Sequence, residues 1–111
     1  MSIAQTAQKS RIPDDADRAE HCANVLKAVA HPLRLRIVAA LCQGEAHVNA
    51  LAERLGASQA IVSQQLRILR MHGLVEARRA DGFARYRLLE PNLKSLVACM
   101  DRCSVRQRSN P

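Results

Sequence analysis

A glycine between two short helical patterns most constrains the fold of this chain. Apolar residues recur at helical spacing over residues 48–55 and again over residues 58–72, with only Gly56 and one alanine between them. Gly56 permits a sharp turn, and Ser58 can cap the second helix by accepting a hydrogen bond from a freed backbone amide. Ala52 is small enough for the two helices to cross closely. The pattern predicts a helix-turn-helix.

The second helix of this unit has one apolar side and one polar side. Val62, Leu66 and Leu69 follow at spacings of four and three, so we expect them to be buried. The remaining faces could enter the major groove of double-stranded DNA, where glutamine matches the edge of adenine and arginine can reach guanine or phosphate. The candidate DNA-binding residues of this helix are Ser58, Gln59, Ala60, Ser63, Gln64 and Arg67.

The hydrophobic period changes from that of a helix to that of a strand after Gly73. Residues 74–79 and 84–88 alternate around Asp81-Gly82, which is typical of a β-hairpin. Arginines flank the expected tip, and a protruding basic ribbon suits contacts with phosphates or the minor groove. The alternative is a charged, solvated edge strand that discourages aggregation. The candidate DNA-binding residues of the hairpin are Arg78, Arg79 and Arg85.

Further helical patterns lie on both sides of these elements. They predict helices over residues 17–30 and from Pro32 until Gln43-Gly44, and a last helix that Pro91 opens and that carries Cys103. The order is ααααββα, so the expected fold is mainly α with a small β-hairpin wing, a winged helix-turn-helix. With 111 residues, one domain is expected. Residues 16–104 would form the DNA-binding and dimerisation domain, between a flexible arm at 1–15 and a flexible tail at 105–111.

The charge balance favours a polyanionic partner. Lysine and arginine total 17 against 10 acidic residues, a formal charge of +7. Phe83 and Tyr86 are the only aromatic residues, which argues against stacking on single-stranded nucleic acid. The sequence shows no nucleophile–base–acid set, so we expect no enzyme and no required cofactor. Without a membrane-spanning or signal-peptide pattern, a cytoplasmic protein is expected. The rival interpretation is a winged-helix protein-interaction module without DNA binding.

Four segments occur in a fixed order over residues 17–103. They are Leu26-Lys27-Ala28-Val29-Ala30-His31-Pro32-Leu33-Arg34-Leu35-Arg36-Ile37, the run from Ser58 to Leu66, Gly73-Leu74-Val75 and Tyr86-Arg87-Leu88. Together they resemble the ArsR/SmtB family of small bacterial winged-helix repressors. The resemblance implies a homodimer, formed mainly by the first and last helices, that binds an inverted-repeat operator and releases it when an inducer binds. It also implies a bacterial cytoplasmic protein that joins the nucleoid when bound to DNA.

The terminal helices fit such a dimer. Both carry apolar stripes that a small core with a wing cannot fully cover. Symmetric pairing would bury these stripes and place two recognition helices about one DNA turn, ~34 Å, apart.

The resemblance also locates two metal sites of the family, and neither is retained. The thiolate site, Glu-Leu-Cys-Val-Cys-Asp-Leu, is replaced by Glu45-Ala46-His47-Val48-Asn49-Ala50-Leu51, which lacks both cysteines and the aspartate. The zinc or nickel site of the last helix corresponds to Glu90, Asn92, Cys103 and Arg106, where a cation replaces a ligand. We expect His21 and His47 to be ordinary exposed residues.

The four cysteines leave the sensing chemistry open. Cys99 and Cys103 are four residues apart, and hence neighbours on one helix face. With Cys22 or Cys42 from either subunit they could bind arsenite or another soft metal ion. A cysteine of the last helix could instead join Cys42 in a disulfide or polysulfide bridge. This resembles the family's persulfide sensors, whose second-helix cysteine lies about one turn nearer His31-Pro32. In the third interpretation, the thiols pack as small hydrophobes.

Overall fold

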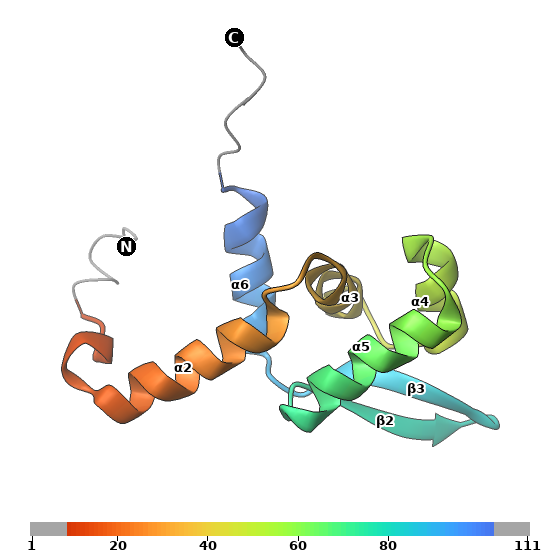
Figure 1. Cartoon of the computed structure of the whole chain (residues 1–111), viewed down its shortest axis with the longest axis horizontal. Coiled ribbons are helices and arrows are strands. Elements are labelled where there is room, and N and C mark those ends of the chain that lie inside the picture. Colours follow the sequence, from red (N-terminus) through yellow and green to blue (C-terminus); the bar gives the residue numbers. More distant parts are fainter. Residues whose placement is uncertain (1–8, 104–111) are drawn as a thin grey trace, which may run out of the picture.

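The computed structural model describes residues 9–103 and contains five α-helices, one 3-10 helix and three short strands there (Figure 1). The helices are η1 (Ile12–Asp14), α2 (Ala16–Val29), α3 (Pro32–Cys42), α4 (Val48–Leu55), α5 (Gln59–Met71) and α6 (Asn92–Asp101). The strands are β1 (Ala46–His47), β2 (Val75–Ala80) and β3 (Phe83–Leu88). The α-helices and the hairpin follow the expected order ααααββα, which confirms a winged helix-turn-helix. Strand β1 was not expected.

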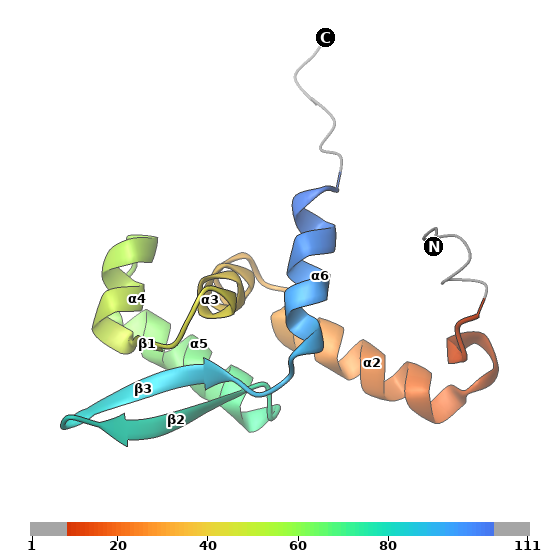
Figure 2. The same cartoon turned by 180° about the vertical axis from the view of Figure 1, so that it is seen from behind.

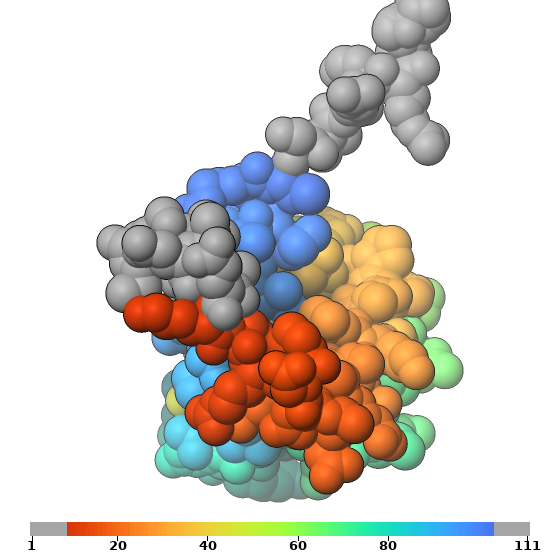
Figure 3. Space-filling view, turned by 90° about the vertical axis from the view of Figure 1, so that its left-hand side faces the viewer, coloured from red at the N-terminus to blue at the C-terminus, as the bar shows by residue number. Residues whose placement is uncertain are grey.

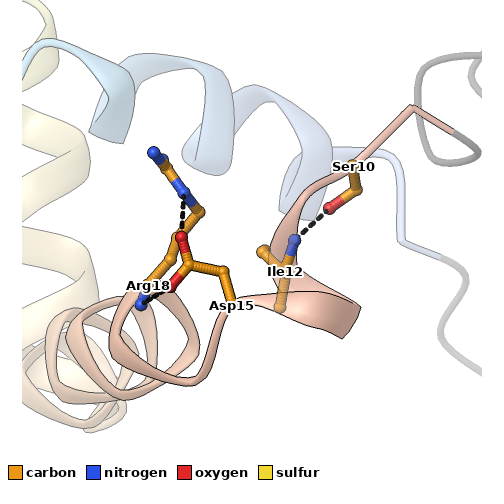
Figure 4. Close-up of polar contacts among 4 residues, drawn as sticks. All are labelled: Ser10, Ile12, Asp15 and Arg18. Atoms are coloured by element: carbon orange, nitrogen blue, oxygen red, sulfur yellow. Dashed lines mark hydrogen bonds and ion pairs between the residues drawn. The ribbon is translucent and has the colours of Figure 1, made fainter.

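The chain enters α2 through a capped turn. Figure 4 shows the Asp15 carboxylate accepting from the backbone N–H of Arg18 at 2.9 Å, and Ser10 Oγ accepting from the N–H of Ile12 at 3.1 Å. Residues 9–15, part of the expected arm, thus include η1 and a helix cap. Residues 1–8 lie outside the described part of the chain, as do residue 104 and the expected tail, 105–111.

Side-chain caps also start the next helices. Nδ1 of His31 accepts from the N–H of Leu33 at 3.1 Å and starts α3, whose first residue, Pro32, needs no amide partner. Ser58 Oγ accepts from the N–H of Ile61 at 3.1 Å and starts α5, as the sequence predicted. These local bonds fix where α3 and α5 begin.

One apolar core holds the helices to the sheet. Val62, Leu66 and Leu69 of α5 are fully buried, which confirms the inner side predicted for this helix. They belong to one cluster with side chains of α2, α3, α4, β2 and α6. The described residues include no buried polar side chain, and no helix among them is long and apolar enough to cross a membrane.

The helix-turn-helix and the wing both depend on left-handed backbone. Gly56 has φ +66°, and the N–H of Ala57 bonds the carbonyl of Ala52 at 3.0 Å, which closes α4. In the hairpin, Asp81 and Gly82 have φ +55° and +82°, a type I′ turn that matches the strand twist. The antiparallel sheet has the order β1-β3-β2, and both views show the hairpin extending past α4 and α5, away from α2 (Figures 1 and 2).

We predict that Gly56→Ala lowers the free energy of unfolding by about 1–2 kcal/mol, because an L side chain in left-handed backbone is strained. A Cβ at Gly56 would meet no atom within 4 Å, so strain alone sets the cost. Urea unfolding followed by circular dichroism measures it. Gly56→Asn is the matched control and should lose less, since asparagine tolerates this conformation. Equal losses in the two variants would contradict the explanation.

Candidate nucleic-acid interface

The polar residues of α5 fall into two groups with different surroundings. Ala60, Gln64 and Arg67 follow one another at spacings of four and three and are all exposed. They form what we call the outer row. It lies on the side of α5 away from the buried Val62 and Leu66, so it is open to a large partner.

The second group faces α4 and the sheet. Ser58 uses its hydroxyl oxygen to cap α5, and Gln59 Nε2 donates to Asn49 Oδ1 at 2.5 Å. Ser63 is half-buried. It lines a hollow between α5 and the wing with the side chains of His47, Val48, Asn49, Phe83, Ala84 and Tyr86. The six candidate residues of this helix therefore do not share one surface.

The strand register separates the arginines of the wing. Arg78 lies directly opposite Arg85, so their side chains share one face of the hairpin, whereas Arg79 is on the other face, opposite Ala84. Arg79 Nη1 donates to the carbonyl of Gly82 at 3.3 Å. On the first face Arg87 pairs with Glu76, with 2.5 Å between Nε and Oε1.

The Arg78–Arg85 pair lacks an acidic partner. The ion pairs within residues 9–103 are Arg87–Glu76 and Arg18–Asp15. Like charges directly opposite one another destabilise a hairpin, by about 0.2–1 kcal/mol. A bound anion would remove this repulsion, so the geometry of the wing favours a phosphate contact at this pair.

His47 departs from the sequence prediction. We expected an ordinary exposed residue, but His47 is half-buried, and its Nδ1 lies 3.1 Å from the carbonyl oxygen of Ala84. Its ring also meets the ring of Phe83 edge-on, with 5.5 Å between centroids. The prediction was wrong because His47 belongs to β1, a strand of two residues that is too short to show a period.

Other arginines are used inside the fold. Arg34 donates from Nε to the carbonyl of Ala28 at 2.6 Å and from Nη1 to Gln65 Oε1 at 2.9 Å. Arg36 Nη1 donates to the carbonyl of Leu55 at 3.2 Å, at the end of α4. Some of the arginines therefore form hydrogen bonds between helices.

The outward faces of α2 and α6 lie on one side of the molecule (Figure 3). Leu26 of α2 is 50% exposed and Met100 of α6 is 44% exposed. A groove runs between the two helices, lined by Arg18, His21, Cys22, Val25, Leu26, Glu90, Asn92, Leu93 and Leu96. This apolar surface lies away from the tip of the wing (Figure 1).

The cysteines differ in exposure, and Cys103 is not where we expected it. All four are free; Cys22 and Cys42 are half-buried, whereas Cys99 and Cys103 are exposed. Helix α6 ends at Asp101, because the N–H groups of Arg102 and Cys103 bond carbonyls three residues back and close the last turn. Cys103 therefore lies directly after the helix and not within it.

The described residues of one subunit hold no cluster of three metal-ligating side chains among histidine, cysteine, aspartate and glutamate. Arg106, which the resemblance places at the second metal site, lies outside the described range.

Burial raises the pKa of the Cys42 thiol above its ordinary value, and the positive charge of Lys94 partly opposes this effect. A raised pKa keeps Cys42 in the neutral thiol form at physiological pH. Because the thiolate is the reactive form, Cys42 is a weak nucleophile in this fold.

We predict a raised pKa for Cys42 in a variant in which the other three cysteines are replaced by serine. The pH at which its rate of reaction with iodoacetamide is half-maximal should lie above the ordinary thiol pKa of about 8.5. Mass spectrometry of the alkylated chain across pH measures the midpoint. Lys94→Met should raise it further, because the variant removes a charge that favours the thiolate. The same chain unfolded in urea is the control and should titrate as an ordinary thiol. A folded midpoint at or below the urea value would contradict the prediction.

Comparison with known proteins gives consistent matches. The model of the family described as "Bacterial regulatory protein, arsR family" matches residues 31–77. The biofilm growth-associated repressor of Xylella fastidiosa is 43% identical over 84 residues, which cover 76% of this chain and 74% of that protein. The crystal structure of the transcriptional repressor BigR from Xylella fastidiosa superposes with a TM-score of 0.75 at 39% identity and covers 84% of this chain and 97% of that one.

A further solved structure is described as a homodimeric winged helix-turn-helix DNA-binding domain, Mb0332 from Mycobacterium bovis. It superposes with a TM-score of 0.68 at 34% identity, over 84% of each chain.

Proposed function

The chain belongs to the arsR family of bacterial regulatory proteins, and we propose that it is a homodimeric repressor that binds an inverted-repeat operator in double-stranded DNA. The family consists of transcriptional regulators and not of enzymes. The observation that carries the proposal for this chain is the Arg78–Arg85 pair, which lies without an acidic partner on the wing that extends past α5.

In this proposal the outer row of α5 reads bases in the major groove. Gln64 and Arg67 are exposed and offer the donors and acceptors that adenine and guanine edges match, and Ala60 can contact a thymine methyl group. Gln59 and Ser63 lie on the neighbouring face of the same helix, Gln59 bonded to Asn49 of α4 and Ser63 beside the wing. Ser58 contributes through the start of α5, where freed amides and the helix dipole favour a phosphate.

The wing supplies contacts that do not depend on sequence. Arg78 and Arg85 would hold phosphates, and Arg79, on the other face of the hairpin, would approach the neighbouring groove. Such contacts release counterions, so they make the affinity fall with salt.

The second subunit would pair along α2 and α6. Leu26 and Met100 leave apolar surface open to water there, and a two-fold pair would bury it. The homodimeric structural relative supports self-association, without specifying the contact surface. The proposed site of self-association is distant from the tip of the wing, so dimerisation leaves the DNA-facing residues there free.

We predict that Arg78→Ala with Arg85→Ala weakens binding to any duplex and lowers the slope of log affinity against log salt by about 2, one unit per lost phosphate contact. The free energy of unfolding should not fall, because the variant removes like-charge repulsion. Fluorescence anisotropy on a duplex selected from a randomised pool measures the affinity and its salt dependence.

The matched control is Glu76→Ala with Arg87→Ala, which removes an ion pair from the same face without changing the net charge. This control should leave the slope nearly unchanged. Failure of the wild-type chain to select any duplex, together with partner binding that is insensitive to salt, would instead indicate a protein-interaction module.

We also propose that thiols carry the response to the inducer. Cys99 and Cys103 are exposed, and Cys22 lines the groove beside α6, so three of the four thiols lie in the region of the proposed dimer contact. Two chemistries fit: a soft ion such as arsenite held by thiolates of both subunits, or a sulfur or redox bridge between two cysteines. If neither operates, the thiols act as small packing residues.

We predict that Cys99→Ser with Cys103→Ser abolishes release of the selected duplex by whichever of arsenite, persulfide or hydrogen peroxide releases the wild-type chain. Without these thiols the reagent has no exposed target on α6 or directly after it. Anisotropy measures release, and mass spectrometry of the wild-type protein identifies the changed thiols. Cys42→Ser separates the two chemistries, because it abolishes release only where Cys42 forms the sulfur bridge. Full release retained in the double variant would reject the sensing role.

A further inference from the structure

The start of α4 carries two side chains that bond to the two DNA-facing elements. Asn49, in the first turn, accepts from Gln59 of α5. His47, directly before the helix, reaches the carbonyl oxygen of Ala84 in β3. The two residues are separated only by Val48, and all three line the hollow that also contains Ser63. One short segment therefore joins the reading helix to the wing.

We propose that Asn49 and His47 are positioning residues for DNA binding: Asn49 orients the amide of Gln59, and His47 fixes the wing beside it. The inference rests on the proposed function, because it concerns how the same surface reads DNA. It adds two residues that are not expected to touch the bases themselves.

The hydrogen-bond capacity of Gln59 fits this role. A glutamine amide has two N–H donors and one carbonyl acceptor, and a bidentate contact with adenine uses one donor and the acceptor. The bond to Asn49 uses the other donor, so it fixes the plane of the amide and leaves free the two groups that adenine requires. A glutamine that is already held loses less rotamer freedom on binding, a loss of up to about 1.5–2 kcal/mol for a free side chain.

His47 contacts the wing at two points, the backbone carbonyl of Ala84 and the ring of Phe83 near the tip. A carbonyl oxygen only accepts, so Nδ1 of His47 carries the proton in the bond to Ala84. Ala84 precedes Arg85, and His47 itself lies opposite Arg85 in the β1–β3 register. The imidazole also supports Phe83, which is 59% exposed at the start of β3. The position of the Arg78–Arg85 pair relative to Gln59 thus depends on two side chains of one segment.

The experiment for Asn49 compares base preference among variants of the full chain. A duplex selected by the wild type is varied at each base pair, and the affinity of every duplex is measured for Asn49→Ala, Gln59→Ala and the double variant. We expect Asn49→Ala to lose most of the preference for adenine at the same base pair as Gln59→Ala, roughly tenfold for one bidentate contact. The double variant should lose no more than Gln59→Ala alone, and the salt slope should stay at its wild-type value.

A second substitution distinguishes loss of the bond to Gln59 from a folding defect. Asn49→Asp retains the acceptor for Gln59 and places an acid near a helix start, which is favourable for the helix. It should keep the adenine preference while weakening binding to all duplexes through charge repulsion. Gln43→Ala, which removes another exposed amide that accepts a hydrogen bond, is the matched control and should change neither property.

The outcomes separate this inference from the function itself. The positioning role would be overturned if Asn49→Ala kept the adenine preference. It would also be overturned if this variant lost preference at a different base pair or had a reduced salt slope, because either result would indicate direct contact of Asn49 with DNA. A wild-type chain that selects no duplex would overturn the proposed function and this inference with it.

The role of His47 is tested by hydrogen exchange of the amides of residues 83–86. His47→Ala should speed their exchange and weaken binding to all duplexes several-fold, whereas His47→Asn, whose amide can donate to Ala84, should restore part of both. His72→Ala, which replaces an exposed histidine at the end of α5, is the control. Unchanged exchange in His47→Ala would overturn this part of the inference.

Discussion

Burial of the inner side of α5 is the interaction on which the rest of the structure depends. Val62, Leu66 and Leu69 are fully buried, and each such side chain stabilises the fold by about 1.5–3 kcal/mol relative to exposure. Their burial fixes the rotation of α5 about its own axis. Gln64 and Arg67 are thereby directed outward, Gln59 stays exposed while it bonds Asn49 of α4, and Ser63 is directed toward the wing. The packing of apolar groups thus determines which polar groups can meet a partner.

Charge repulsion within the wing opposes folding, whereas the burial of apolar side chains favours it. Arg78 and Arg85 face each other across the strands, yet the neighbouring Arg87 is neutralised by Glu76 on the same face. The repulsion is worth less than the burial of one leucine, so the fold tolerates it. Because the cost is present without a partner and absent when phosphates are bound, the arrangement makes the free wing slightly less stable and favours an anion.

Local signals were readable in the sequence, and contacts between distant segments were not. Gly56, Ser58 and Asp81-Gly82 act within a few residues of themselves, so they predicted the turn, the cap and the hairpin. The bonds of His47 to Ala84 and of Asn49 to Gln59 join residues 37 and 10 positions apart. The hydrophobic periodicity of a sequence does not indicate which distant residues will bond to one another. The end of α6 before Cys103 was missed for a different reason: helix ends without a glycine or proline carry a weak signal.

The residues at the start of α4 bear on where an inducer can act. His47 and Asn49, at the positions where the resemblance places thiolate ligands, are engaged with Ala84 and Gln59, whereas the cysteines lie on α2, at the end of α3, and on or directly after α6. In the proposed thiol response, a ligand of these cysteines can act on α5 through α2 or α3, since Arg34 of α3 bonds both Ala28 of α2 and Gln65 of α5. A hydrogen bond to a charged group contributes about 1.5–3 kcal/mol, and tenfold release of DNA needs only about 1.4 kcal/mol. Under the proposed function, loss of a single bond of this kind is therefore large enough to couple the thiols to α5.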